Sequence, residues 1–222
     1  MADGGLGWGA VMWAWHGIIN QDKPFVPKPI RDVYWGPAFS DQEIENALTA
    51  KRIRYSRPEN LEKVMADLLA QGELIARFNG AMEFGPRALG NRSIIGDAQS
   101  PKMQRKMNLK IKYRESFRPF APTILAERIS DYFEIDRESP YMLLVSQVKK
   151  EIQIPMKEED ENSFGLAKLN VVRSNVPAIT HIDYSARIQS VNADENPMYH
   201  KLIKKFEEKS GCPVIVNTSF NV

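Results

Sequence analysis

The segment from Glu73 to Asp97 reads ELIARFNGAMEFGPRALGNRSIIGD, with two short apolar runs on either side of a glycine-rich loop. The runs at 73–78 and 93–97 predict strands, because they are short, apolar and bounded by turn-forming residues. The loop at 80–93 has three glycines and a proline, so its backbone can approach a ligand closely. Its Arg87 and Arg92 stand among backbone amides, an arrangement typical of phosphate sites. The segment therefore predicts two strands joined by an anion-binding loop.

Helices and further strands alternate on both sides of this segment. Periodicity and caps predict helices at 41–50, 58–70, about 100–111 and 196–209, and an amphipathic helix that ends near Phe133. Short apolar runs predict strands at 120–125, 141–148, 178–182, 187–191 and 213–216. The polar stretch 149–163 predicts a solvated insertion. The pattern is that of an α/β protein with a mixed, twisted sheet and flanking helices.

The N-terminal region differs in composition from the rest of the chain. Leu6 to Ile19 is an apolar run of 14 residues, too short to span a bilayer comfortably, and Asp3 rather than a basic segment precedes it. We expect neither a membrane anchor nor a signal peptide. Three tryptophans in the run, Trp8, Trp13 and Trp15, favour association, with homodimerisation as one form. Residues 22–40 hold four prolines and predict an extended linker.

Bulk composition restricts the class of protein. The formal net charge is only +2, so affinity for an anion must come from local clustering. The single cysteine, Cys212, excludes an intramolecular disulfide framework and is consistent with a reducing cytoplasm. The chain shows no motif for covalent catalysis and no Cys/His spacing of a zinc site. Transfer chemistry on phosphorylated substrates, through positioning and charge neutralisation, fits these residues better.

Basic residues are concentrated between Lys102 and Arg118, where seven of them face a single acidic residue. Lys112 and Arg118 follow the predicted helix and stand among apolar and proline residues, where a charged group needs a partner. That partner is either a phosphate or a structural carboxylate. Arg187 is equally open between an anion pocket and the surface. Asn217 and Ser219 end the last strand, where they either contact a ligand or turn the chain.

Several blocks resemble the C-terminal region of the nodulation-type and antibiotic O-carbamoyltransferases. They are Met82-Glu-Phe-Gly-Pro-Arg-Ala-Leu-Gly-Asn-Arg-Ser93, Asn108-Leu-Lys-Ile-Lys-Tyr-Arg-Glu-Ser-Phe-Arg-Pro-Phe-Ala-Pro122, Ser139-Pro-Tyr-Met, Thr180-His-Ile-Asp, Ala186-Arg-Ile-Gln-Ser-Val and Asn217-Thr-Ser-Phe-Asn-Val. The resemblance implies a module similar in fold to threonylcarbamoyl-adenylate synthase at 41–222, incomplete at its C-terminus. Residues 1–21 are then a remnant of an N-terminal actin-like transferase module, and 22–40 link the two.

The resemblance also implies an activity and its residues. The module is expected to form carbamoyl-adenylate from carbamoyl phosphate and ATP with Mg²⁺, and the N-terminal module to pass the carbamoyl group to a hydroxyl acceptor. Catalytic roles fall to Lys112, Arg118 and Arg187. Contacts with substrate or nucleotide fall to Arg87, Asn91, Arg92, Asn217, Ser219 and Asn221, of which Asn91 and Arg92 are expected to shape the loop. Asp3 resembles a metal-site aspartate that acts only in the full-length protein, where the family's N-terminal module holds a metal ion, iron.

Two rival readings remain. The basic cluster could bind RNA backbone, although the modest net charge and the lack of interleaved aromatic residues argue against nucleic acid. Alternatively, the chain folds but needs its missing N-terminal transferase module as a partner before it does chemistry.

Overall fold

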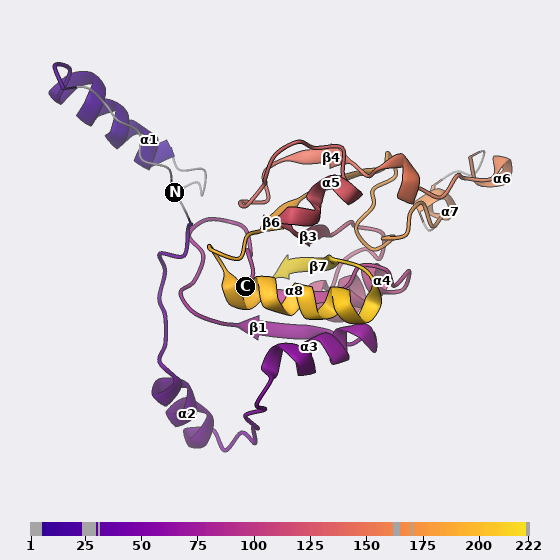
Figure 1. The fold of residues 1–222 in the computed structure, drawn as a ribbon, viewed down its shortest axis with the longest axis horizontal. Helices are drawn as coiled ribbons and strands as arrows, with labels where there is room; N and C mark the ends of the chain where they lie inside the picture. The colour runs from indigo at the N-terminus through magenta and orange to yellow at the C-terminus, as the bar shows by residue number, and fades with distance from the viewer. Residues whose placement is uncertain (1–5, 24–29, 31, 162–164, 170, 221–222) are drawn as a thin grey trace.

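The computed structural model describes residues 6–23, 30, 32–161, 165–169 and 171–220. Its main sheet has five strands in the order β1-β2-β7-β3-β6 (Figure 1). They are β1 Ile75–Phe78, β2 Arg92–Asp97, β7 Val214–Ser219, β3 Ala121–Leu125 and β6 Gln189–Val191. Only the β3–β6 pairing is parallel, so the predicted mixed α/β architecture is confirmed.

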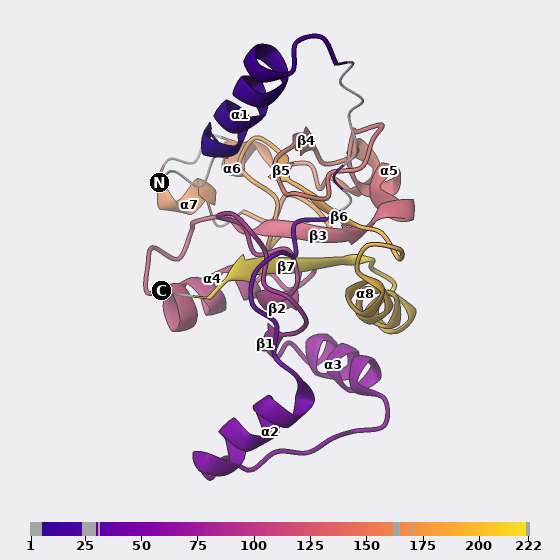
Figure 2. The ribbon, with the colours of Figure 1, turned by 90° about the vertical axis from the view of Figure 1, so that its left-hand side faces the viewer.

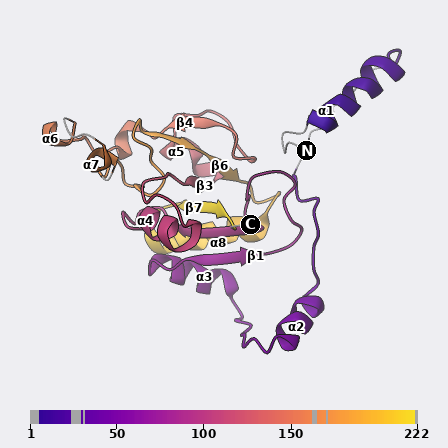
Figure 3. The same ribbon diagram turned by 180° about the vertical axis from the view of Figure 1, so that it is seen from behind.

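Both faces of this sheet are buried. Along β2 the side chain of Ile94 belongs to one apolar cluster and that of Ile95 to another, because successive side chains of a strand point to opposite faces. Helices α3 Leu61–Ala70 and α8 Pro197–Ser210 cover the Ile95 face (Figure 2). Helix α4 Met103–Met107 covers the Ile94 face. Figure 3 shows this helix in a view of the molecule from behind.

Local sequence signals explain where these helices begin and end. Asn196 caps α8 by accepting a hydrogen bond from the amide of Tyr199 at 3.2 Å, with Pro197 in the first turn. Gly211 ends the helix in a left-handed conformation at φ 74°. Helix α4 continues into a π-helical turn, η2 Asn108–Lys112, which carries Lys112 at its end. The remaining helices are α2 Asp41–Ala50, η3 Ala126–Arg128, α5 Ile129–Tyr132, η4 Lys150–Ile152, α6 Glu158–Glu161 and α7 Leu166–Leu169.

The expected strand at 141–148 is mostly wrong. Only β4 Val145–Gln147 is a strand, and it pairs with β5 Ser185–Arg187 outside the main sheet. Leu143 and Val145 are well exposed, while Met142 and Val148 are buried, so only the two ends of this apolar run enter the core. The expected strand at 187–191 divides between β5 and β6, which places Arg187 at the end of the hairpin and Gln189 in the main sheet.

The expected strand at 178–182 is wrong. Residues 177–179 form a turn in which the Thr180 hydroxyl donates to the carbonyl of Val176 at 3.0 Å. Ala178 and Ile179 are nevertheless fully buried. The apolar side chains are therefore buried from a turn rather than from a strand.

The described part of the linker from residue 32 onward is extended and docked on the glycine-rich loop. The amide of Gly36 donates to the carbonyl of Met82 at 2.9 Å, and the amide of Phe84 donates to the carbonyl of Val33 at 2.7 Å. Residues 33–37 therefore run along the glycine-rich loop as a strap.

The apolar run near the N-terminus is helical and exposed. It forms α1 Leu6–Trp13 and the π-helical turn η1 Ala14–Ile19, in which no residue is buried (Figure 1). Trp8, Trp13 and Trp15 are each more than half exposed. No helix within the described residues is long and apolar enough to cross a membrane.

Candidate functional site

The topology brings several basic segments to one end of the sheet. Strand β7 runs antiparallel to β2 and β3, with Ser219 opposite Ser93 and Asn217 opposite Ala121. The loops that lead into β2 and β3 therefore lie beside the carboxyl end of β7. Because β6 is parallel to β3, Arg187, which precedes β6, lies at this same end.

Hydrogen bonds join these segments at β7. The Asn217 amide donates to the carbonyl of Ala88 at 3.0 Å and to Oε1 of Gln189 at 2.8 Å. Two residues further on, Ser219 accepts from the Lys112 ammonium through its carbonyl and, at 3.3 Å, through its hydroxyl. Lys112, Asn217, Ser219 and the loop of Arg87 are thus brought together from distant parts of the chain.

The cationic groups of the site influence one another. Burial lowers the pKa of Arg187, and the nearby charge of Arg87 lowers it further. Burial and Arg114 likewise lower the pKa of Lys112. Arg118 is exposed, and its charge adds to burial in lowering the pKa of Arg114. These pKa shifts follow first from burial and second from like charges that lie close together, and a bound anion would relieve the repulsion.

These cations lack acidic partners. Within the described residues no ion pair involves Lys112, Arg87, Arg118 or Arg187. The Nε atoms of Arg87 and Arg187 are buried without a hydrogen-bond partner.

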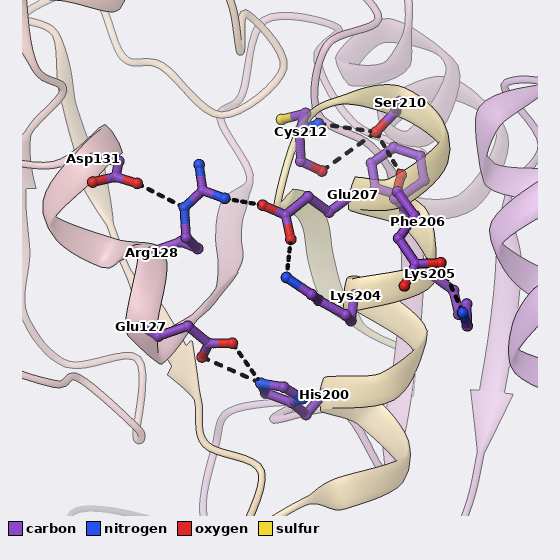
Figure 4. Close-up of polar contacts among 11 residues, drawn as sticks. Glu127, Arg128, Asp131, His200, Lys204, Lys205, Phe206, Glu207, Ser210 and Cys212 are labelled. Atoms are coloured by element: carbon purple, nitrogen blue, oxygen red, sulfur yellow. Dashed lines mark hydrogen bonds and ion pairs between the residues drawn. The ribbon is translucent and has the colours of Figure 1, made fainter.

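Where helix α8 faces η3 and α5, the cations have acidic partners (Figure 4). Lys204 of α8 pairs with Glu207 at 2.9 Å. Arg128 pairs with Asp131 at 2.6 Å and also with Glu207. The contrast is between cations that acidic side chains neutralise and a cluster of cations that no acidic side chain among the described residues neutralises, which makes the cluster a candidate functional site.

The backbone amides at the end of the loop are engaged within the protein, so the expected amide nest does not extend over residues 89–92. Oε1 of Glu83 accepts from the amides of Leu89 at 2.8 Å, Asn91 at 2.7 Å and Arg92 at 3.2 Å. The Gly90 amide donates to the Ser93 hydroxyl at 2.9 Å. A carboxylate of the protein itself thus takes the place that a phosphate would take at these amides, while anion contact at Arg87 stays a prediction.

Asn91 and Arg92 are engaged within the protein. The Asn91 side chain is buried and bonds to the carbonyl of Ala81, at 2.9 Å, and to Arg77 and Asn196. The Arg92 guanidinium donates to four backbone carbonyls and lies 3.6 Å from the centre of the Phe78 ring. These contacts fit the expected role in shaping the loop, while contact of either residue with a ligand stays a prediction.

A cavity of about 510 Å³ lies beside the segment that carries Arg118. Its lining includes Phe117 and Pro119, which flank Arg118 in the sequence, together with His181, while Lys112, Arg87, Arg118 and Arg187 are not among the lining residues. Burial lowers the pKa of His181, and Arg187 contributes to the shift. The volume is in the range of small-molecule sites.

Some sequence predictions lie outside the described residues, and other site residues were not predicted. Asp3 and Asn221 are in the first group, so their roles stay predictions. Within the described residues no group of three or more His, Cys, Asp or Glu side chains could hold a metal ion.

Glu83 was missed, although a lone carboxylate in a loop rich in backbone donors is a detectable signal. Tyr34 and Asn196 were missed because only the fold brings them to the loop.

The fold is that of a mixed α/β domain with several cationic side chains at one end of its sheet. A model of the carbamoyltransferase C-terminus family matches residues 66–222. The chain belongs to this family.

Relatives in other organisms agree with this assignment. An uncharacterised protein of Synechocystis is 50% identical over 99% of this chain, and the chain covers 37% of that protein. Nodulation protein NolO of Bradyrhizobium diazoefficiens is 36% identical over 90% of the chain, which covers 34% of it. The 3'-hydroxymethylcephem-O-carbamoyltransferase of Streptomyces clavuligerus is 36% identical over 71% of the chain, which covers 26% of it. The chain thus spans about a third of the length of these relatives.

Proposed function

We propose that this domain binds carbamoyl phosphate and ATP and forms carbamoyl-adenylate, which a transferase module then uses to carbamoylate a hydroxyl acceptor. The observation that carries the proposal is the gathering of Lys112, Arg87, Arg118 and Arg187 at the carboxyl end of β7 without acidic partners among the described residues. Membership of the family and a cephem O-carbamoyltransferase among the relatives support the carbamoyl chemistry.

Atom balance divides the reaction into two events. Carbamoyl phosphate must lose its own phosphate, with water supplying the oxygen, to leave carbamate. A carbamate oxygen then bonds to the α-phosphorus of ATP as the bond to pyrophosphate breaks. Both events bring anions together, and fixed cations lower the electrostatic cost of doing so.

The residues divide between these anions according to their chemistry. The guanidinium groups of Arg87 and Arg187 match phosphate oxygens in planar, two-pronged contacts, whereas the Lys112 ammonium is a compact charge. Ser219, held by Lys112, supplies a hydroxyl at the same point. The buried Oδ1 of Asn217 has no partner, and an amino group such as that of carbamoyl is a matching donor.

ATP needs room beside these cations and a magnesium ion. The cavity next to Arg118 offers apolar walls, such as Phe117 and Pro119, for a nucleoside. Since the described residues provide no carboxylate cage, Mg²⁺ would be held mainly by the nucleotide phosphates and water. The resemblance to the threonylcarbamoyl-adenylate synthase fold, in which a related adenylate is made, supports the same assignment.

Calorimetric titration of the chain with carbamoyl phosphate, with and without a non-hydrolysable ATP analogue and Mg²⁺, tests the proposal. Lys112→Ala and Arg118→Ala should weaken binding by about tenfold or more, as expected when a hydrogen bond to a charged group is lost. Lys110→Ala is the matched control, because Lys110 lies in the same turn, η2, and is exposed. Wild-type affinity for carbamoyl phosphate in all three variants would place the site elsewhere.

The RNA-binding alternative has less support. The cations converge on the end of one strand instead of following a surface groove, and the net charge is small. Binding of single-stranded RNA that competes with carbamoyl phosphate would favour this alternative.

A further inference from the structure

The loop that carries Arg87 is closed by its own Glu83. The Glu83 side chain is only 6% exposed, and its Oε1 accepts hydrogen bonds from three backbone amides. The first of these amides belongs to Leu89, so the carboxylate bridges residues on the two sides of Arg87. Closing a short loop in this way removes most of its freedom.

A buried carboxylate needs a compensating charge, and Arg77 supplies it. Arg77 is also 6% exposed, and the charge of Glu83 counters the lowering of its pKa by burial. The Arg77 guanidinium donates to the carbonyl of Gly90 and, at 3.2 Å, to Oδ1 of Asn91. Glu83 therefore holds the donors of this segment while Arg77 holds its acceptors.

Other elements fix the backbone next to Arg87. The Ala88 carbonyl accepts from Asn217 at 3.0 Å. The Leu89 carbonyl accepts from the Tyr34 hydroxyl at 3.1 Å and from the Gln189 amide at 2.8 Å. The strap, β6 and β7 thus converge on the two residues that follow Arg87.

The Arg87 head group contrasts with this fixed backbone. Its Nε is buried without a partner, and its charge lies near that of Arg187. Two like charges repel each other, so they stay in a binding arrangement only if their supports are rigid.

We propose that Glu83 is a positioning residue: its carboxylate fixes the loop so that Arg87 is held beside Arg187, ready for a phosphate group. The role rests on the proposed function, in which these two arginines bind carbamoyl phosphate. Glu83 does not itself touch the ligand.

A double-mutant cycle tests this role. Carbamoyl phosphate affinity is measured calorimetrically for the wild type, Glu83→Ala, Arg87→Ala and the double variant. Glu83→Ala removes the oxygen that accepts from the three amides, and it should weaken binding by about tenfold, the lower end of what loss of a supporting contact costs at a site. In the Arg87→Ala background the same change should have no further effect, because Glu83 acts through Arg87. If the Glu83 change acted only by destabilising the whole fold, its effect on carbamoyl phosphate affinity would add to that of Arg87→Ala.

A milder variant covers the case in which Glu83→Ala does not fold, and a direct probe complements the cycle where it does. Tyr34→Phe removes one hydrogen bond to the Leu89 carbonyl, and it should weaken binding severalfold in the wild type but not in Arg87→Ala. Hydrogen exchange should show the Leu89 and Asn91 amides protected in the wild type and in Arg87→Ala, and faster in Glu83→Ala.

The outcomes separate the two hypotheses. Binding by folded Glu83→Ala at wild-type affinity, together with loss in Arg87→Ala, would overturn the positioning role and leave the proposed function standing. Additive effects of the two changes would also overturn it. Absence of saturable binding by the wild type would overturn the proposed function and the positioning role with it.

Discussion

Replacing Gly90 by alanine should destabilise the protein strongly, and the structure provides a matched control. Gly90 has φ 115°, and a Cβ there would lie 2.4 Å from Cδ1 and 2.6 Å from Cε1 of Tyr199. Gly85, in the same loop, has φ 112° with nothing within 4 Å of its Cβ position. Alanine at either site meets the same backbone strain, but only at Gly90 does it also meet a buried ring.

The magnitude follows from these two effects. A non-glycine residue in such a conformation costs about 1–3 kcal/mol. Overpacking a well-packed core costs typically about 1–3 kcal/mol more. Tyr199 is fully buried, so its ring has no solvent to move into. Reduced freedom of the unfolded chain offsets about 0.4–1 kcal/mol in both variants. We expect Gly90→Ala to lose about 2–4 kcal/mol and Gly85→Ala about 1 kcal/mol.

Thermal and urea unfolding followed by circular dichroism measure this difference. For a chain of this size about 1 kcal/mol corresponds to roughly 2–4 °C, so the midpoint of Gly90→Ala should lie several degrees below that of Gly85→Ala. Gly90→Ala should also bind carbamoyl phosphate less tightly at temperatures where it is folded, because the Gly90 carbonyl accepts from Arg77. Equal losses of stability in the two variants would refute the close approach of Gly90 to Tyr199.

Three other predictions follow from charge and burial. Burial and Arg114 lower the pKa of Lys112, so anion binding should weaken as the pH rises through this lowered pKa. In Lys112→Arg this decline in affinity should vanish, and a decline that persists would contradict the assignment. Burial raises the pKa of the Cys212 thiol to about 11, so a thiol reagent at pH 8 should label it only after unfolding in urea, and rapid labelling of the native protein would contradict its burial. Arg128→Ala should cost only about 0.5–1 kcal/mol in urea unfolding, since Glu207 keeps its pair with Lys204, and a loss of several kcal/mol would show that the network in Figure 4 acts as a unit.

Much of the sheet could be predicted because its strands carry a local signal. The runs at 73–78, 93–97, 120–125 and 213–216 each overlap a strand of the main sheet, and β7 continues three residues beyond the last of them. The run at 178–182 has the same composition but follows Pro177 and forms a turn. A short apolar run predicts that its side chains are buried, but it does not predict whether the backbone there is a strand or a turn.

The candidate site divides in the same way. Cations that follow a strand or a helix could be singled out from the sequence, and the structure brings Lys112 to Ser219 and Arg87 to Arg187. The occupant of the loop amides could not be predicted, because Glu83 and a bound phosphate satisfy the same donors. The partners of Tyr34 and Asn196 lie more than 50 residues away in sequence, so only the fold identifies them.

The separation of backbone support from side-chain charge explains how one end of the sheet can hold several unpaired cations. If the loop amides bound the phosphate directly, the loop would lack support whenever the ligand was absent. Because Glu83 occupies the amides of Leu89, Asn91 and Arg92, this part of the loop keeps its shape without ligand, and in the proposed function the Arg87 side chain is left to meet the anion. The repulsion between Arg87 and Arg187 is then borne by the folded core, through Asn217 and Gln189 in adjoining strands. A site of this kind should gain stability when an anion binds, because binding removes a repulsion that folding alone leaves in place.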